Sequence, residues 1–268
     1  MNHIFKDTMA DGSWAELAAQ AARGALALLP LGVIEEHGPH LCLGTDIYTA
    51  HLYCLAVRDK LKEQGHEAVI APPFYWGVCQ STGGFTGSFA IRRETAKALL
   101  YDILSSLYNF GFNRVFGVNA HGDIEHSVAI LEAFREASET LPITACYAFD
   151  EGRLIHFGLT GEEPYVCPVK PQTVAVSRAS VPDVHGGDIE TAMIRRYYPK
   201  LADAETAKAL PPVALPGEKA MDWLFGGHIQ ELSPQGYLGA PAEFEGVSVE
   251  ANLNDYAERI TQAILARL

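Results

Sequence analysis

Short apolar runs alternate with longer amphipathic stretches over the first 150 residues of the 268-residue chain. A run such as 25–34 has almost no polar position, which is typical of a strand buried on both faces of a parallel sheet. The stretches between the runs repeat apolar residues at helical spacing, as Ala50, Cys54 and Val57 do. This pattern predicts strands over 25–34, 67–71, 114–119 and 142–149, and helices over 13–23, 49–64, 94–110 and 124–138.

The second half of the chain is less regular. Segment 150–182 has no clear period, segment 200–250 is rich in Pro and Gly, and helices are predicted over 188–198 and 254–268. Strands and helices that alternate in this order are joined by right-handed crossovers, which place helices on both faces of a parallel sheet. We therefore expect a three-layer α/β/α fold with a mostly parallel central sheet. A single domain over 1–268 is expected, since no repeat or linker divides the chain.

Composition and charge exclude several classes of function. The 20 basic and 33 acidic residues give a net charge of −13, and without a basic run this argues against a nucleic-acid partner. No stretch reaches the roughly 18 consecutive apolar residues of a membrane helix, and the N-terminus lacks a signal-peptide pattern. The five cysteines contain no CxxC pair, which argues against a disulfide framework and a cysteine-based structural zinc site. We expect a cytoplasmic protein without a membrane or nucleic-acid partner.

Residues able to bind metal gather where two of the predicted strands end. The first strand is followed by Glu35, His37 and Asp46, and the third by His121 and Asp123. The carboxyl ends of parallel strands form the edge of an α/β sheet where ligands bind. In each run an acid and a histidine lie two positions apart, so in extended chain both side chains point to the same side.

A third cluster, from His185 to Glu190, opens the predicted helix 188–198, and its glycines let the backbone approach closely. Histidine and carboxylate together suit zinc, manganese or iron, and a carboxylate can bridge two ions. Glu36 lies one residue out of phase with its neighbours and should face away. A single Glu-x-His pair is more often two solvated residues than two ligands. Two such pairs at strand ends, with a third cluster, favour a metal site.

Three segments resemble the signature motifs of one enzyme family. LPLGVIEEHGPHLCLGTD, at 29–46, closely resembles the motif LPxGxxEQHGPHLPLGTD of the creatininase, or creatinine amidohydrolase, family. NAHGD, at 119–123, resembles the family's NGHGGN or NGHxEN segment, and HGGDIET, at 185–191, resembles its HAGxxET segment. The segments follow the family's order, and the resemblance extends from about residue 25 to 193.

The resemblance implies a homo-oligomeric α/β/α metal hydrolase with two divalent ions per chain, zinc or manganese or a mixture, with iron as a further option. By motif position, one ion is held by Glu35, Asp46 and His121. The other is held by His37, Asp46 and Asp123, so that Asp46 bridges the two. The implied reaction is metal-assisted hydrolysis, in which an activated water attacks a carbonyl.

Further roles follow from the same resemblance. His185 matches the family's catalytic histidine, which protonates the leaving group or holds the oxyanion, and Glu190 matches the acid that orients it or carries the proton. Cys79 stands where creatininase itself has a substrate-contacting serine. Creatininase also holds creatinine between two tryptophans, and this chain has none between Trp76 and Trp223. The resemblance therefore does not point to creatinine as the substrate.

The implied substrate is a small molecule, a cyclic amide or formamide, so that the enzyme is an amidohydrolase acting on non-peptide C–N bonds. Family relatives also include a formamide deformylase, a peptidase of peptide-cofactor maturation, and a ring-opening hydrolase of keto-inositols of the 3-dehydro-scyllo-inosose type. A non-catalytic relative that binds metal or ligand is the competing class.

The family resemblance points to a hexamer or another dimer-based homo-oligomer. Apolar and aromatic residues in the irregular segments would support an interface, because a lone sheet does not easily cover them. They are Tyr165, Val166, Trp223, Leu224, Phe225, Tyr237 and Phe244.

Overall fold

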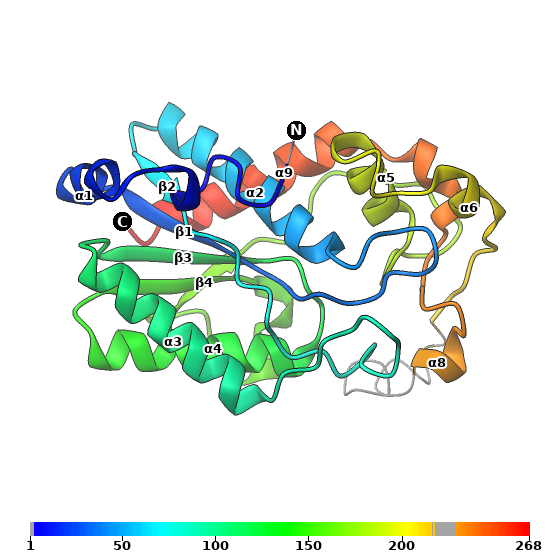
Figure 1. Cartoon of the computed structure of the whole chain (residues 1–268), viewed down its shortest axis with the longest axis horizontal. Helices are drawn as coiled ribbons and strands as arrows, with labels where there is room; N and C mark the ends of the chain where they lie inside the picture. The colour runs from blue at the N-terminus through cyan, green and yellow to red at the C-terminus, as the bar shows by residue number, and fades with distance from the viewer. Residues whose placement is uncertain (1–2, 216, 218–228) are drawn as a thin grey trace.

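The computed structural model describes residues 3–215, 217 and 229–268. In this part of the chain the strands form one sheet, composed of β1 (Leu26–Leu31), β2 (Ala68–Ile70), β3 (Arg114–Asn119), β4 (Thr144–Asp150) and β5 (Val166–Val169). Every neighbouring pair is parallel, and the order is β2-β1-β3-β4-β5 (Figure 1). β1 and β3 are therefore neighbours from which the chain winds outward in opposite directions. Ligands of open α/β sheets bind at such a switch point, beyond the carboxyl ends of the strands.

Helices cover both faces of the sheet, as the pattern predicts (Figure 1). Leu26 and Leu28 of β1 pack in the apolar cluster on one face, whereas Ala27 and Leu29 pack in the cluster on the other. The first face is covered by α2 (Thr45–Glu63), α5 (Asp188–Tyr197) and α9 (Val249–Leu265), and the second by α3 (Arg93–Asn109) and α4 (Ile124–Thr140). The three-layer α/β/α prediction is confirmed.

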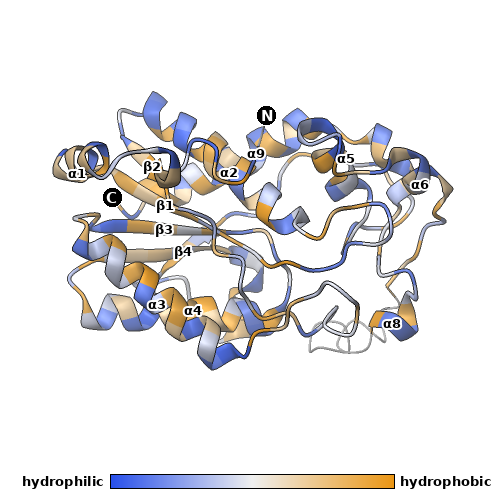
Figure 2. Ribbon diagram, viewed as in Figure 1, coloured by the Kyte–Doolittle hydropathy of each residue, from blue (hydrophilic) through white to orange (hydrophobic). Residues whose placement is uncertain are grey.

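Figure 2 shows mostly apolar strands between helices that carry both apolar and hydrophilic residues. This distribution matches a sheet buried on both faces and helices with one face in solvent. Among the helices of the described residues, none combines the length and the apolar composition that a membrane crossing would need.

Two helices begin earlier than their apolar pattern predicts. α2 begins at Thr45 instead of 49, and α9 begins at Val249 instead of 254. The first turn of α2 follows Gly44 and precedes the apolar period that begins at Ala50, so the pattern does not include it. The Thr45 hydroxyl donates to the Cys42 carbonyl oxygen at 2.8 Å and fixes this start. Asp46 consequently lies in the first helical turn, where the helix dipole favours a negative charge.

The segment predicted to be irregular, 150–182, contains β5 and the short helix η2 (Glu151–Phe157). β5 has only four residues and includes Pro168, which an edge strand tolerates because one side of it makes no ladder hydrogen bonds. The remaining short elements are η1 (Met9–Asp11), α1 (Trp14–Ala22), α6 (Ala204–Ala209), α8 (Ile229–Leu232) and η4 (Pro241–Gly246). Ser13 caps α1 in a full capping box with Glu16.

The apolar residues that were expected to need an oligomer interface are largely covered within the chain. Val166, Tyr237 and Phe244 are buried. Tyr165 is partly buried and packs against the apolar cluster between the sheet and helices α3 and α4. The expectation is wrong for these side chains because β5 and the segment after α8 fold onto the body of the molecule. Trp223, Leu224 and Phe225 lie outside the described residues.

Candidate metal centre

The loops that follow β1 and β3 meet the first turn of α2 at the switch point of the sheet. The carboxylate of Glu35 lies 2.8 Å from His121, measured from Oε1 to Nδ1. Asp46 reaches both loops, since its Oδ1 lies 3.2 Å from His37 Nε2 and its Oδ2 lies 3.1 Å from His121 Nδ1. The structure thus brings together Glu35, His37, Asp46 and His121, four of the residues that the strand-end clusters and the motif placed in one site.

A close approach of the backbone allows this contact. Gly32 lies between β1 and the first cluster, and a Cβ atom built there would lie 2.9 Å from the Cβ of Asp46 and 3.0 Å from Ile47. Real Cβ atoms do not approach so closely, so a side chain at position 32 would push the start of α2 away. Glycine at this position therefore sets the distance between Asp46 and the loop after β1.

Each of the three central histidines hydrogen-bonds a backbone carbonyl with one ring nitrogen and turns the other toward the carboxylates. His37 Nδ1 lies 3.2 Å from the backbone oxygen of Glu35, and His121 Nε2 lies 3.1 Å from that of Val78. His185 Nε2 lies 2.7 Å from the backbone oxygen of Glu36. A carbonyl oxygen only accepts, so the ring nitrogen must donate. This fixes the tautomer in each ring, as is usual for histidines that ligate metals.

The central side chains of the site are buried, and their charges balance one another. Glu35, His37 and Asp46 are at most 2% exposed. Burial by itself would raise the pKa of Glu35, but the imidazoles of His121, His185 and His37 outweigh it and hold that pKa well below its usual value. Burial likewise opposes charge on His37, yet Glu190 and Asp46 raise its pKa well above the ordinary value. The buried carboxylates therefore need positive charge nearby. Protons on the histidines or a divalent cation can supply that charge.

The donor atoms fit a metal ion. Asp46 Oδ2 is buried and pairs with His121 Nδ1 at 3.1 Å, a nitrogen that donates only when the imidazole is protonated. Three sets of ligand atoms lie within 4.8 Å of one another: Glu35, Cys79 and His121; Glu35, His37 and His185; and His37, Asp46 and Glu190. Carboxylate and imidazole donors of this kind suit zinc and manganese.

The family model for creatininase, described as creatinine amidohydrolase, matches residues 10–264 of the chain. The chain belongs to the creatininase family. The creatinine amidohydrolase of Pseudomonas putida is 25% identical over 210 residues, which cover 76% of each chain. The mycofactocin precursor peptide peptidase of Mycobacterium ulcerans (strain Agy99) is 28% identical over 220 residues, covering 80% of this chain and 74% of the peptidase. A tryptophan-to-phenylalanine mutant of creatininase has the same fold, with a TM-score of 0.69 over 97% of each chain at 21% identity.

In this creatininase-family chain, the motifs imply Asp123 as a metal ligand and Glu190 as an acid near His185, and both line the cavity of the site. Asp123 caps α4, because its Oδ1 accepts from the backbone N–H of His126 at 3.1 Å. Its Oδ2 accepts from the backbone N–H of Gln80, in the loop after β2, at 2.9 Å. It lines the site's cavity but belongs to none of the three ligand sets. Glu190 does belong to one, since its Oε2 lies 3.9 Å from His37 Nε2.

His185 enters the site from the chain before α5. Its ring lies 4.3 Å from the ring of His37, and its Nδ1 lies 3.8 Å from Glu35 Oε1. Burial and His37 lower the pKa of His185, but the carboxylates, Glu35 first, outweigh them and raise it above the usual value. His185 is thus placed to hold a proton beside the cavity.

Glu36 stays outside the three ligand sets, in agreement with its predicted phase, but it is not solvated. Its carboxylate is buried behind His185, with Oε1 3.5 Å from His185 Nε2 and Oε2 accepting from the Gly38 amide at 2.9 Å. Sequence reasoning did not find this contact, because phase alone does not tell a buried outward-facing residue from an exposed one.

The loop after β2 contributes residues that sequence patterns did not reveal. The Thr82 hydroxyl donates to Glu35 Oε2, and Ser81 lines the cavity. Val78 supplies the carbonyl that orients His121. These are common residue types in a loop without periodicity, so only the motif position of Cys79 gave a signal there.

The cavity over these side chains has a volume of about 130 Å³. A second cavity, of about 270 Å³, shares the wall formed by His121, Gly122 and Glu190 and extends toward Tyr147 and Arg153. Their combined size suits a small molecule or the end of a peptide rather than a folded protein.

Proposed function

We propose that this chain is a metal-dependent hydrolase that uses two divalent ions to cleave a carbonyl–nitrogen bond in a small cyclic amide or formamide. The observation that carries the proposal is the set of three buried histidines, each held by a backbone carbonyl and each turned toward carboxylates. The family match supports it. Solved creatininase structures include a manganese form and a zinc–zinc form, which supports these ions as candidates.

For the first ion we propose Glu35, Asp46 and His121 as ligands, which agrees with the resemblance. For the second we propose His37 and Asp46, with Glu190 as the third side chain. This choice departs from the implied Asp123, because Glu190 belongs to a ligand set with His37 and Asp46 whereas Asp123 belongs to none. Bound divalent ions lower the pKa of water and polarise a carbonyl oxygen, which is the chemistry of metal-assisted hydrolysis.

His185 acts on the substrate in this proposal. Its Nε2 donates to the backbone carbonyl oxygen of Glu36, so its Nδ1 is the nitrogen turned toward Glu35 and the cavity. A proton on Nδ1 can pass to the leaving nitrogen or stabilise a developing oxyanion.

A second candidate is the cleavage of a peptide bond near the end of a peptide. It is favoured by the mycofactocin precursor peptide peptidases, one of which matches 80% of this chain. Ring opening of a keto-inositol and a purely binding role are the third and fourth candidates, and both follow from the resemblance alone.

A substrate screen tests these candidates. Protein loaded with zinc or with manganese is offered cyclic amides, formamides, short peptides and keto-cyclitols, and product is followed by mass spectrometry. We expect turnover of a cyclic amide or formamide that disappears with chelator and returns with metal. Turnover of peptides alone would support the second candidate, and metal binding without turnover of any compound would support the binding role.

A further inference from the structure

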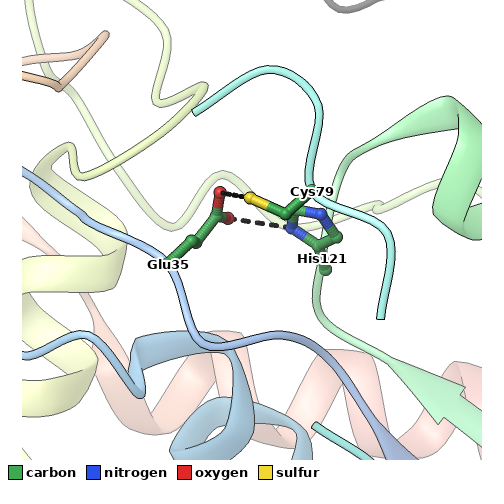
Figure 3. Close-up of side chains that lie close together, drawn as sticks. All are labelled: Glu35, Cys79 and His121. Carbon is green, nitrogen blue, oxygen red and sulfur yellow. Dashed lines mark hydrogen bonds and ion pairs between the residues drawn. The ribbon is translucent and has the colours of Figure 1, made fainter. Parts of the chain in front are cut away.

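Cys79 differs from the other buried cysteines of the chain. Cys54, Cys146 and Cys167 pack in the apolar cluster between the sheet and α2 and α9. Cys79 is fully buried as well, but it belongs to neither apolar cluster. Its side chain faces the metal centre from the loop after β2 (Figure 3). A thiol in this position is not accounted for by packing alone.

The thiol lies among the donor atoms of the first ion. Cys79 Sγ is 3.3 Å from Glu35 Oε2 and 2.9 Å from Thr82 Oγ1. One ligand atom each from Cys79, Glu35 and His121 lie within 4.8 Å of one another (Figure 3). Tetrahedral zinc with bonds of roughly 2.0–2.3 Å places its ligand atoms roughly 3.3–3.8 Å apart. Small movements would therefore bring sulfur, oxygen and nitrogen to bonding distance of one ion.

A second observation points to a cation at the same place. Asp46 Oδ2 is buried without a hydrogen bond from the described residues, and it lies 3.1 Å from the same His121 Nδ1. Asp46 itself is only 2% exposed. His121 Nδ1 also faces Glu35, and it can donate to this buried oxygen only when the ring is protonated; otherwise a cation must satisfy the oxygen. The oxygen and the thiol thus converge on a common space beside His121.

We propose that Cys79 is a thiolate ligand of the ion held by Glu35, Asp46 and His121, rather than a residue that only contacts substrate. When the ion binds, a metal–sulfur bond forms, the S–H bond breaks and the proton leaves to solvent, with no change of oxidation state. The proposal rests on the proposed function in placing a metal ion at this site. It deepens that function by making the first site softer than one of oxygen and nitrogen alone, which selects zinc over manganese there.

Cobalt substitution tests the bond directly. Protein freed of metal by chelation is titrated with Co²⁺, and its absorption spectrum is recorded. A thiolate ligand gives a sulfur-to-cobalt charge-transfer band in the near ultraviolet, in addition to the visible cobalt bands. We expect this band in the unaltered protein and in Cys54→Ala, a control at another buried cysteine. We expect Cys79→Ser to keep the visible cobalt bands and to lose the charge-transfer band.

Metal affinity gives a second readout. Cys79→Ser should lower the affinity for Zn²⁺ by about 10–100-fold or more, the loss seen even for partners outside the ligand shell. The affinity for Mn²⁺ should change little, since manganese prefers oxygen ligands. Equal losses for both ions would contradict a role in selecting zinc.

The unaltered protein keeps the proposal testable if Cys79→Ser does not fold. The NMR signal of cadmium-113 bound to the protein lies far downfield when sulfur is a ligand. The cadmium-113 spectrum of the unaltered protein therefore shows whether Cys79 binds the ion without the need for a variant. Visible cobalt bands without a charge-transfer band, or a cadmium shift typical of oxygen and nitrogen ligands, would overturn the role of Cys79 and leave the metal site standing. Failure to bind any of these ions would overturn the proposed metal centre as well.

Discussion

Asp46 joins the two halves of the proposed metal centre through its two carboxylate oxygens, one facing His37 and the other His121. Asp46→Ala should therefore lose both ions, since each site loses a ligand. Glu190→Gln should lose the second ion only, and Asp123→Asn should keep both. Elemental analysis of protein purified without chelator measures the ions per chain. Asp59→Ala, an exposed position on α2, is the control, and an Asp46→Ala protein with two ions would refute the bridge.

His185 allows metal binding to be separated from catalysis. His185→Ala should keep both ions and the fold, because its Nδ1 faces the cavity but we assign it to neither ion. Turnover should fall by about 10²–10⁴-fold, the usual effect of removing a general acid or base. His156→Ala, at an exposed histidine, should be unaffected. If His185→Ala loses metal in elemental analysis, His185 is a ligand and this division of roles is wrong.

At the scale of elements, the site depends on how closely α2 approaches the chain leaving β1. Gly32→Ala would place a methyl group 2.9 Å from the Cβ of Asp46 and move the first turn of α2 outward. The affinity for the ions should then fall by about 10–100-fold, as for other changes that displace a ligand without removing it. Isothermal titration with Zn²⁺ measures the loss. Gly246→Ala, where the new methyl group meets nothing within 4 Å, should bind like the unaltered protein.

The strands and helices also differ in how well the sequence alone predicts them. The pattern predicts β3 and the start of α4 at the residues where the structure has them, because a buried apolar run and a polar cap mark both clearly. It does not predict β5, since four residues that include a proline carry too little pattern to identify an edge strand. Nor does it predict the start of α2, because residues 45–48 precede the apolar period and the start is marked by a local bond from the Thr45 hydroxyl to the Cys42 carbonyl oxygen.

Some residues of the candidate site can likewise be predicted from the sequence, and others cannot. Glu35, His37, Asp46 and His121 could be found from strand ends and motif order. The convergence of Cys79 on Glu35 could not, because the loop after β2 has no period and its path follows from packing across the switch point. The engagement of Asp123 as a helix cap likewise depends on where α4 begins relative to that loop.

For the whole molecule, assembly stays a prediction that rests on the family resemblance, because Val166, Tyr237 and Phe244, three of the seven apolar residues first offered for it, are buried within the chain. Large apolar side chains do remain exposed, among them Trp76 and Phe89, whose rings lie 5.3 Å apart. We expect a homo-oligomer, hexameric or otherwise dimer-based, in light scattering at micromolar concentration. A clean monomer would contradict it.

The stability of the whole molecule should depend on metal through the two loops and α2 that the ions would tie together. Each ion that binds the folded chain and not the unfolded chain stabilises it by about 2.7 kcal/mol when its free concentration is about 100 times the Kd. For a chain of this size that corresponds to a rise in Tm of roughly 5–10 °C. Chelation should therefore lower the Tm of the unaltered protein in scanning calorimetry, and added Zn²⁺ should restore it. Asp46→Ala should show the same Tm with and without chelator, because it holds no ion to lose. An equal response of both proteins would mean that the chelator acts elsewhere on the chain.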